Sequence, residues 1–192
     1  MAHEQIFVQI AAYRDGQLPH TLDSLLGEAF DASRLRICIC WQHARHERIP
    51  ARFRHSPNIE IIEVDHRLSR GANWARRQVQ RRWKGEPYSL IIDSHLRFVR
   101  HWDKRLIEMM AELKRNGVPR PVITCYPPKF FPQTYPKGRW NAPLKTYKEA
   151  FREGLLVHFA GFRIPLWRWL EAPIPAQFLA LGFLFTEGSF NR

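Results

Sequence analysis

The sequence predicts an α/β fold in a single domain, with a mostly parallel, doubly wound sheet flanked by helices. Short apolar runs typical of buried strands alternate with stretches whose apolar residues recur at helical spacing. Alternating strands and helices form βαβ units, which build parallel sheets covered by helices. The 192 residues match one ordinary domain, and a hydrophobic content of 45% can supply its core.

The first 126 residues carry the clearest alternation. Pro19 stands where proline can open a helix, and apolar residues follow it at positions 22, 25, 26 and 29. A later amphipathic helix should stop at Asn116-Gly117, a typical C-terminal signal. The expected strands are residues 6–12, 35–41, 59–64, 88–92 and 121–126, and the expected helices begin at Pro19 and cover residues 72–83 and 102–114.

The last third is less regular. Residues 126–143, YPPKFFPQTYPKGRWNAP, form a loop rich in proline, lysine and aromatic residues. Residues 155–161 resemble a strand, residues 165–172 a helix, and FLALGFLFTEGSFNR closes the chain. No internal repeat or low-complexity linker divides the sequence.

The chain is strongly basic. Thirty Lys and Arg residues against eighteen Asp and Glu residues give a net charge of +12. The basic residues extend from Arg14 to Arg192, so the charge belongs to the folded body and favours a polyanionic partner. Charge alone does not separate DNA, RNA, an anionic membrane surface and a nucleotide-sugar.

Three cysteines are too few for a disulfide framework, and their odd number indicates reduced thiols in a cytoplasmic protein. Cys38 and Cys40 lie two apart on an expected strand and therefore share a face, which favours a place in the core. Zinc binding by these thiols with His43 is the alternative. No run of 18 apolar residues and no secretory leader is evident.

Polar side chains follow three of the expected strands. In open parallel sheets, ligands bind at the carboxyl ends of the strands, so these side chains are candidates for a site. The three polar strand ends are Tyr13-Arg14-Asp15, Trp41-Gln42-His43 and Asp93-Ser94-His95.

Asp93 and His95 are two residues apart and should project to the same side. A carboxylate oxygen and an imidazole nitrogen could hold one Mg²⁺ or Mn²⁺, with water, another residue or a diphosphate completing the shell. In the alternative interpretation, Asp93 caps the turn and His95 is solvated.

These residues sit within a longer resemblance. IFVQIAAYRD, ICWQH, SRGANWAR, IIDSHLRF, ITCYPP, HFAGF and FTEGSF occur in the order seen in the N-acetylglucosaminyltransferase family that modifies hydroxyproline on polypeptide. More distantly, the chain resembles the polypeptide N-acetylgalactosaminyltransferases. The resemblance implies a GT-A-like fold that binds a UDP-sugar through a metal held by an Asp-x-His motif. It also implies a nucleotide-binding part over residues 1–126 and an acceptor-side part over residues 127–192.

The resemblance implies roles for individual residues. Asp93 and His95 would bind the metal, with Ser94 between them, and Glu187 would contact sugar or acceptor. At this position the family shows Gly-Glu-Glu or Gly-Glu-Asn, whereas this chain has Thr186-Glu187-Gly188. The sequence also ends five residues after Glu187. The comparison with the family therefore implies incomplete metal coordination. The residues expected around the nucleotide are Ala12, Tyr13, Arg14, Asp15, Arg70, Gly71, Ala72, Trp74 and Arg76.

The implied reaction moves a GlcNAc-like sugar from a UDP-sugar to an acceptor hydroxyl, with retention of anomeric configuration. The acceptor would be a polypeptide or, because of the charge and of aromatic residues that could stack on bases, a hydroxymethylated base of DNA. A non-catalytic nucleic-acid-binding protein derived from such a domain is the rival hypothesis.

Overall fold

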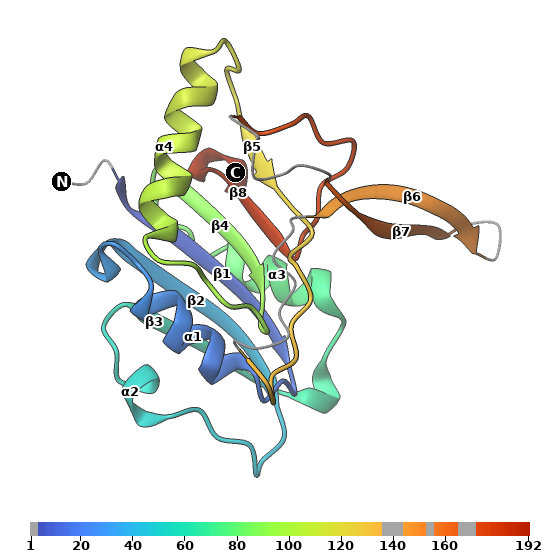
Figure 1. Cartoon of the computed structure of the whole chain (residues 1–192). Helices are drawn as coiled ribbons and strands as arrows, with labels where there is room; N and C mark the ends of the chain where they lie inside the picture. The colour runs from blue at the N-terminus through green and yellow to red at the C-terminus, as the bar shows by residue number, and fades with distance from the viewer. Residues whose placement is uncertain (1–3, 136–143, 153–155, 165–171) are drawn as a thin grey trace. The chain divides into compact units, whose positions relative to one another are not determined.

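The computed structural model describes residues 4–135, 144–152, 156–164 and 172–192 (Figure 1). It is an α/β fold with a six-stranded, mostly parallel central sheet flanked by helices. The strands are β1 (Ile6–Tyr13), β2 (Leu35–His43), β3 (Ile59–Asp65), β4 (Tyr88–Asp93), β5 (Val122–Thr124), β6 (Leu144–Arg152), β7 (Leu156–Arg163) and β8 (Phe183–Glu187). The α-helices are α1 (Leu18–Gly27), α2 (Ala51–Arg54), α3 (Ala72–Gln80) and α4 (Trp102–Arg115), and three short 3₁₀ helices are η2 (Ala32–Arg34), η3 (His66–Leu68) and η5 (Gly188–Asn191).

The strand order in the large sheet is β3-β2-β1-β4-β8-β5. Strands β1 to β4 are parallel, with β1 paired to both β2 and β4. The amide of Gly188, just after β8, donates to the carbonyl of Pro87, just before β4, at 2.7 Å. Strand β8 therefore ends where β4 begins, so it runs against its neighbour. The carboxyl ends of β1, β2 and β4 thus form one edge of the sheet, and the end of β8 belongs to the opposite edge.

Helices cover both faces of this sheet. Helices α1 and α4 lie in front of the strands in the view of Figure 1, and α3 lies behind them. The face under α3 is packed by Phe7, Cys38, Cys40, Ala75 and Val79, all fully buried. On the other face, Leu18, Leu22 and Leu25 are the buried apolar residues of α1. Apolar strands covered on both faces are what holds a parallel sheet together.

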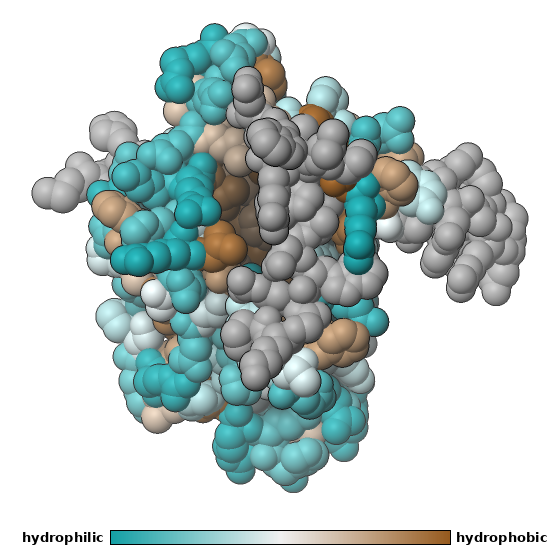
Figure 2. Space-filling view, viewed as in Figure 1, coloured by the Kyte–Doolittle hydropathy of each residue, from teal (hydrophilic) through white to brown (hydrophobic). Residues whose placement is uncertain are grey.

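Helix ends follow the sequence signals closely. Pro19 occupies the first turn of α1, where its missing N–H costs no hydrogen bond. Helix α4 ends at Arg115, and Gly117 takes a left-handed φ of 86°, which a side chain would resist. No helix in the described part of the chain is long and apolar enough to cross a membrane. On the face seen in Figure 2, hydrophilic side chains predominate over α1 and α2.

The chain divides into two compact units, which are residues 1–123 with 185–192, and residues 124–184. The second unit contains the antiparallel pair β6–β7, a two-stranded sheet with a register irregularity between Lys148 and Ala150. Gly161 of β7 lies close to the buried Leu144 of β6 and to Tyr126, because a Cβ on Gly161 would meet these side chains at 3.0–3.5 Å.

The predicted fold class is confirmed, and six predicted strands, β1 to β5 and β7, are present within two residues of their expected bounds. Strand β6 was not predicted, because its polar sequence LKTYKEAFR has no clear alternation. Helix α3 ends at Gln80, three residues before its expected end, and Trp83 instead packs against the core while its ring nitrogen donates to the carbonyl of Glu86. The helix predicted over residues 165–172 lies outside the described residues apart from position 172.

Candidate functional site

Three strand ends meet at one edge of the sheet because the strands are parallel and in register. Tyr13 of β1 pairs with Gln42 of β2, and Ala11 of β1 pairs with Asp93 of β4. Paired residues on neighbouring strands point to the same face. Ala11 and Cys40 are also partners, and Cys40 is buried under α3, so these side chains lie on the α3 face of the sheet.

A pocket of about 270 Å³ opens at this edge. It lies between the ends of β1 and β2 and the beginning of α3. Tyr13 is 54% exposed and offers a ring face there. Gly71 immediately precedes α3 with a φ of 89°, which favours glycine, and leaves the backbone open to the pocket. The lining residues are Ala11, Tyr13, Gln42, Ser69, Gly71 and Ala72.

A chain of hydrogen bonds shapes the wall of this pocket. The amide of Gly71 donates to Ser69 Oγ at 3.2 Å, and the Ser69 hydroxyl donates to Gln42 Oε1 at 2.6 Å. Gln42 is buried, and its Nε2 lies 3.5 Å from the carbonyl oxygen of Ala12. A buried amide is stable only when such partners satisfy it, so the wall is fixed before any ligand arrives.

Asp93 ends β4 beside this pocket. Its carboxylate accepts a hydrogen bond from Arg76 Nη2 of α3 at 3.1 Å. The Asp93 side chain is 39% exposed and that of Arg76 is 22% exposed, so both are partly open to solvent. The site thus contains the guanidinium of Arg76, which lies one helical turn beyond the start of α3, and the carboxylate of Asp93, to which it donates.

Asp15 connects the end of β1 to the turn after β4. Its Oδ2 accepts hydrogen bonds from Ser94 Oγ at 2.6 Å and from His95 Nδ1 at 2.8 Å, while Oδ1 accepts the amide of Gln17 at 2.8 Å. The hydrogen bond from His95 is the main cause that lowers the pKa of Asp15 to about 2, and the bonds from Ser94 and Gln17 add to it, outweighing the effect of burial.

The pKa of His95 is raised in return. The hydrogen bond to Asp15 is the largest cause, the negative charges of Asp15 and Asp93 contribute, and burial opposes them. The Asp93 carboxylate is therefore close enough to His95 to act on it electrostatically. The two residues of the Asp-x-His motif have different hydrogen-bond partners, but they belong to one charged cluster.

The donor set fits a divalent cation only in part. Asp93 supplies a carboxylate, and with Nδ1 held by Asp15, His95 retains Nε2 as a nitrogen that can bind a cation. Among the residues that the structure describes, no group of three His, Cys, Asp or Glu side chains is arranged to hold a metal ion. Two ligands suit a hard cation that keeps water and takes phosphate oxygens, as Mg²⁺ does.

Several other predicted nucleotide residues do not reach the pocket with their side chains. Ala12 is fully buried, and Trp74 packs against the core under α3. Arg14 has a left-handed φ of 47° and is paired with Glu47 at 3.4 Å. Arg70 is exposed beside Gly71. The predicted site residues that do belong to the pocket or to the charged cluster are Tyr13, Asp15, Gly71, Ala72, Arg76, Asp93, Ser94 and His95.

Glu187 lies elsewhere. It is the last residue of β8, and Gly188 contacts Glu86 and Pro87 at the start of β4, so Glu187 belongs to the edge opposite Asp93. Its carboxylate pairs with Lys114 Nζ in the last turn of α4 at 2.5 Å. The structure thus does not bring Glu187 together with Asp93 and His95. The reason is the antiparallel direction of β8, which no local sequence pattern indicated.

Ser69 and Ala11 line the pocket but were not predicted as site residues, and Gln42 was a candidate only as part of a polar strand end, with no role assigned to it. For Gln42, a signal existed, because it follows an apolar strand and belongs to one of the three polar strand ends. Ser69 lies two residues before Gly71 in a loop, and only its hydrogen bonds reveal its position.

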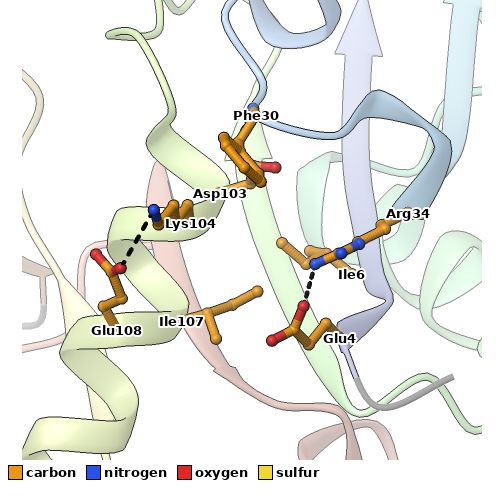
Figure 3. Close-up of a pocket in the computed structure, with 8 residues that line it drawn as sticks. All are labelled: Glu4, Ile6, Phe30, Arg34, Asp103, Lys104, Ile107 and Glu108. Atoms are coloured by element: carbon orange, nitrogen blue, oxygen red, sulfur yellow. Dashed lines mark hydrogen bonds and ion pairs between the residues drawn. The ribbon is translucent and has the colours of Figure 1, made fainter. Parts of the chain in front are cut away.

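A second pocket of about 260 Å³ lies at the opposite edge, between the start of β1 and α4. Figure 3 shows its charged side chains turned toward one another, with Arg34 reaching Glu4 and Lys104 reaching Glu108. Asp103 is buried there and accepts the amides of Phe30 and Asp31, at 2.6 and 3.0 Å. Asp103 therefore ties α4 to the segment after α1, while Lys104 and Glu108 pair with each other along α4.

The zinc alternative finds no support in the geometry. Cys38 and Cys40 are free and buried, and burial raises the pKa of their thiols to about 12 and about 11. The ring of His43 stacks on Trp41 with centroids 3.7 Å apart, and its Nε2 lies 3.3 Å from Glu63. Thiols that resist ionisation are poor zinc ligands.

The aromatic loop is described up to Tyr135. Phe130 packs edge to face on Tyr135 with centroids 5.6 Å apart, and Lys129 lies 5.1 Å from the ring centre of Phe131. Phe131 is 46% exposed. These aromatic side chains make contacts within their own loop, while Lys137, Arg139 and Trp140 lie outside the described residues.

In open α/β sheets, ligands bind in the crevice at the carboxyl ends of the strands, which is where this fold has its pocket and charged cluster. The family model described as Glycosyltransferase (GlcNAc) matches residues 5–57 and 50–192. The chain belongs to this family and is a glycosyltransferase. A glycosyltransferase uses an activated sugar donor and an acceptor. No curated protein matches the chain.

Proposed function

We propose that this protein transfers a GlcNAc-like sugar from a UDP-sugar to an acceptor hydroxyl and depends on Mn²⁺ or Mg²⁺. The observation that supports this most directly is the position of Asp93, because its strand partner Ala11 lines the pocket, with His95 two residues further on. Family membership supplies the reaction class, and the site supplies groups for a nucleotide and a diphosphate.

In this proposal, the pocket takes the nucleoside of the donor. Its volume of about 270 Å³ is just below the range of about 300–1,000 Å³ that holds a whole drug-sized ligand. The pocket therefore suits the base and part of the ribose, with the rest of the donor extending toward Asp93. The exposed ring of Tyr13 offers a stacking surface, and the side-chain amide of Gln42 offers a polar group to the base.

The diphosphate would lie between the start of α3 and the charged cluster. The first amides of a helix point at its N-terminus and attract phosphate oxygens, and Gly71 leaves that terminus open. Arg76, now 3.1 Å from Asp93, adds a guanidinium that matches phosphate geometry. Asp93 and His95 Nε2 would hold the cation, with water and diphosphate oxygens as its remaining ligands.

The reaction breaks the bond between the anomeric carbon and the β-phosphate oxygen, whose electron pair leaves with UDP. The acceptor oxygen forms a new bond to that carbon, and its proton is released together with UDP. A bound divalent cation supplies Lewis-acid stabilisation of the leaving diphosphate. Arg76 and the amides at the start of α3 stabilise the same charge, and their fixed positions mean that little reorganisation is needed. Retention of anomeric configuration is part of the proposal by resemblance to the family.

The acceptor in this proposal is a hydroxyl of a polypeptide or of a hydroxymethylated base in DNA. We propose a polypeptide acceptor because of the resemblance to the hydroxyproline-modifying family. We propose a DNA acceptor because the net charge of +12 is larger than binding of a nucleotide-sugar requires.

The test is a donor and acceptor screen that monitors UDP release from purified protein. UDP-GlcNAc and other UDP-sugars are offered with hydroxyproline peptides and with hydroxymethylated DNA, in Mn²⁺ and again after EDTA. We expect release that needs both Mn²⁺ and one acceptor class. Turnover that is unaffected by EDTA would contradict the metal dependence.

A non-catalytic nucleic-acid-binding protein is the second candidate, and the same basic charge favours it. The two candidates differ in UDP binding measured by calorimetry. The enzyme should bind UDP more tightly when Mn²⁺ is present. A binding module should show no such dependence, but it should bind DNA with an affinity that falls steeply as salt rises.

A further inference from the structure

The turn after β4 is held almost entirely by the beginning of α1. Besides the two bonds to Asp15, Thr21 Oγ1 donates to the carbonyl of Ser94 at 2.7 Å and accepts the amide of Leu96 at 3.0 Å. Arg97 Nη2 donates to Gln17 Oε1 at 2.6 Å. The backbone on both sides of His95 is therefore fixed by residues about eighty positions away in sequence.

Within this turn, the imidazole ring of His95 has one fixed and one available nitrogen. Nδ1 lies 2.8 Å from Asp15 Oδ2, and a carboxylate can only accept, so Nδ1 carries a proton. In a neutral ring, Nε2 is then the nitrogen with a lone pair. The His95 side chain is 59% exposed, so packing does not fix its orientation, whereas Asp15 is only 19% exposed and is anchored by Ser94 and Gln17.

We propose that Asp15 is a positioning residue for the metal site: it holds His95 Nδ1–H so that Nε2 is presented toward the cation bound with Asp93. This inference rests on the proposed function and changes the expected role of Asp15 from nucleotide contact to orientation of a ligand. A carboxylate behind a ligating histidine fixes its tautomer and ring orientation and strengthens its binding.

The test measures Mn²⁺ affinity in the presence of UDP, by calorimetry or electron paramagnetic resonance, for Asp15→Asn, His95→Ala and the double variant. We expect Asp15→Asn to weaken Mn²⁺ binding by about 10- to 100-fold, the range typical of such outer-shell partners. In the His95→Ala background, Asp15→Asn should have no further effect on Mn²⁺, because the residue acts through His95.

Asp31→Asn is the matched control. Asp31, like Asp15, accepts the amide of the residue two positions further on, that of Ser33 at 3.0 Å, and its hydrogen bonds and ion pair do not include His95. Its substitution should leave Mn²⁺ affinity within about 2-fold, as expected of a residue outside the outer shell. Circular dichroism of each variant checks that the fold is retained.

A second measurement needs no variant. The ¹⁵N spectrum of His95 in the intact protein, at a pH where the ring is neutral, should show the proton on Nδ1 and a bare Nε2. A proton on Nε2, or an Asp15→Asn effect that persists in His95→Ala, would overturn the inference. If His95→Ala itself leaves Mn²⁺ affinity unchanged, the proposed metal site fails, which is a different outcome.

Discussion

The two edges of the central sheet carry pockets of nearly equal size but different chemistry. At the carboxyl edge, neutral groups line the pocket, and Asp93, Arg76 and His95 stand beside it partly exposed. At the amino edge, Arg34 and Lys104 line the pocket already paired with acidic side chains (Figure 3). Pocket volume therefore does not distinguish a ligand site from packing between elements.

Glu187 and its neighbours show the same difference between the two edges of the sheet. Its ion pair with Lys114 joins β8 to α4, and nearby Glu86 is buried and pairs with Arg36. The pKa of Glu86 is lowered although burial raises it, because Arg36 and the amide of Lys84 stabilise the charged form. Charges at the amino edge stabilise the fold, whereas those at the carboxyl edge are arranged around space that a ligand can enter.

The largest expected effect is that of removing the acid at the carboxyl edge, compared with removal of an acid at the amino edge. We expect Asp93→Ala to lower Mn²⁺-dependent UDP release by at least about 100-fold, as loss of a major electrostatic stabiliser does. Glu187→Ala, the matched variant at the opposite edge, should change release by less than about 2-fold, because exposed and partly exposed ion pairs contribute about 0–1 kcal/mol and only to stability. A folded Asp93→Ala protein with normal turnover would refute the assignment of the site.

A change at the amino edge should instead affect stability. A Cβ on Gly188 would lie 1.7 Å from the carbonyl oxygen of Glu86, a backbone atom that cannot move away on its own. Gly188→Ala should lower the free energy of unfolding by about 1–3 kcal/mol, as overpacking does.

Urea denaturation measures this loss. The control is Gly27→Ala at the end of α1, where a Cβ meets no atom within 4 Å. That change should be neutral or stabilising, since alanine favours helix by about 1 kcal/mol over glycine. Equal stability of the two variants would show that β8 does not approach β4 as closely as the structure has it.

The smallest expected effect compares two exposed aromatic rings, one at each pocket. Tyr13 is 54% exposed and Phe30 is 52% exposed. Tyr13→Ala should weaken UDP binding by about 5- to 100-fold, because stacking of a base on an aromatic ring is worth about 1–3 kcal/mol. Tyr13→Phe should retain binding and Phe30→Ala should not affect it. Calorimetry with UDP and Mn²⁺ measures all three affinities. Weaker UDP binding by the Phe30→Ala variant would contradict the proposal, because it would place the nucleotide at the amino edge.

Much of this architecture can be predicted from short patterns in the sequence. Strands such as β1 and β2 are short, nearly continuous apolar runs, which is typical of buried parallel strands, and Pro19 and Gly117 mark helix ends by their backbone chemistry. Asp93 and His95 were found because their spacing and their position after a strand are local properties. Strand β6 was missed because its apolar residues do not alternate.

Contacts between distant residues could not be predicted in this way. Asp15 was expected near a nucleotide, and only the structure shows that it binds Ser94 and His95, which are 79 and 80 positions away. Gln42 and Ser69 are similar cases, since their bond joins the end of β2 to the loop before α3 and forms a pocket wall.

The sequence by itself determined the α/β class, the order of β1 to β5 with α1, α3 and α4, and the Asp-x-His pair, because apolar runs and residue spacing act over a few positions. Only the tertiary structure decided which charges converge and which are paired off. The physical reason is strand direction. Parallel β1, β2 and β4 carry their polar ends to one edge, while β8 runs the other way and takes Glu187 to Lys114.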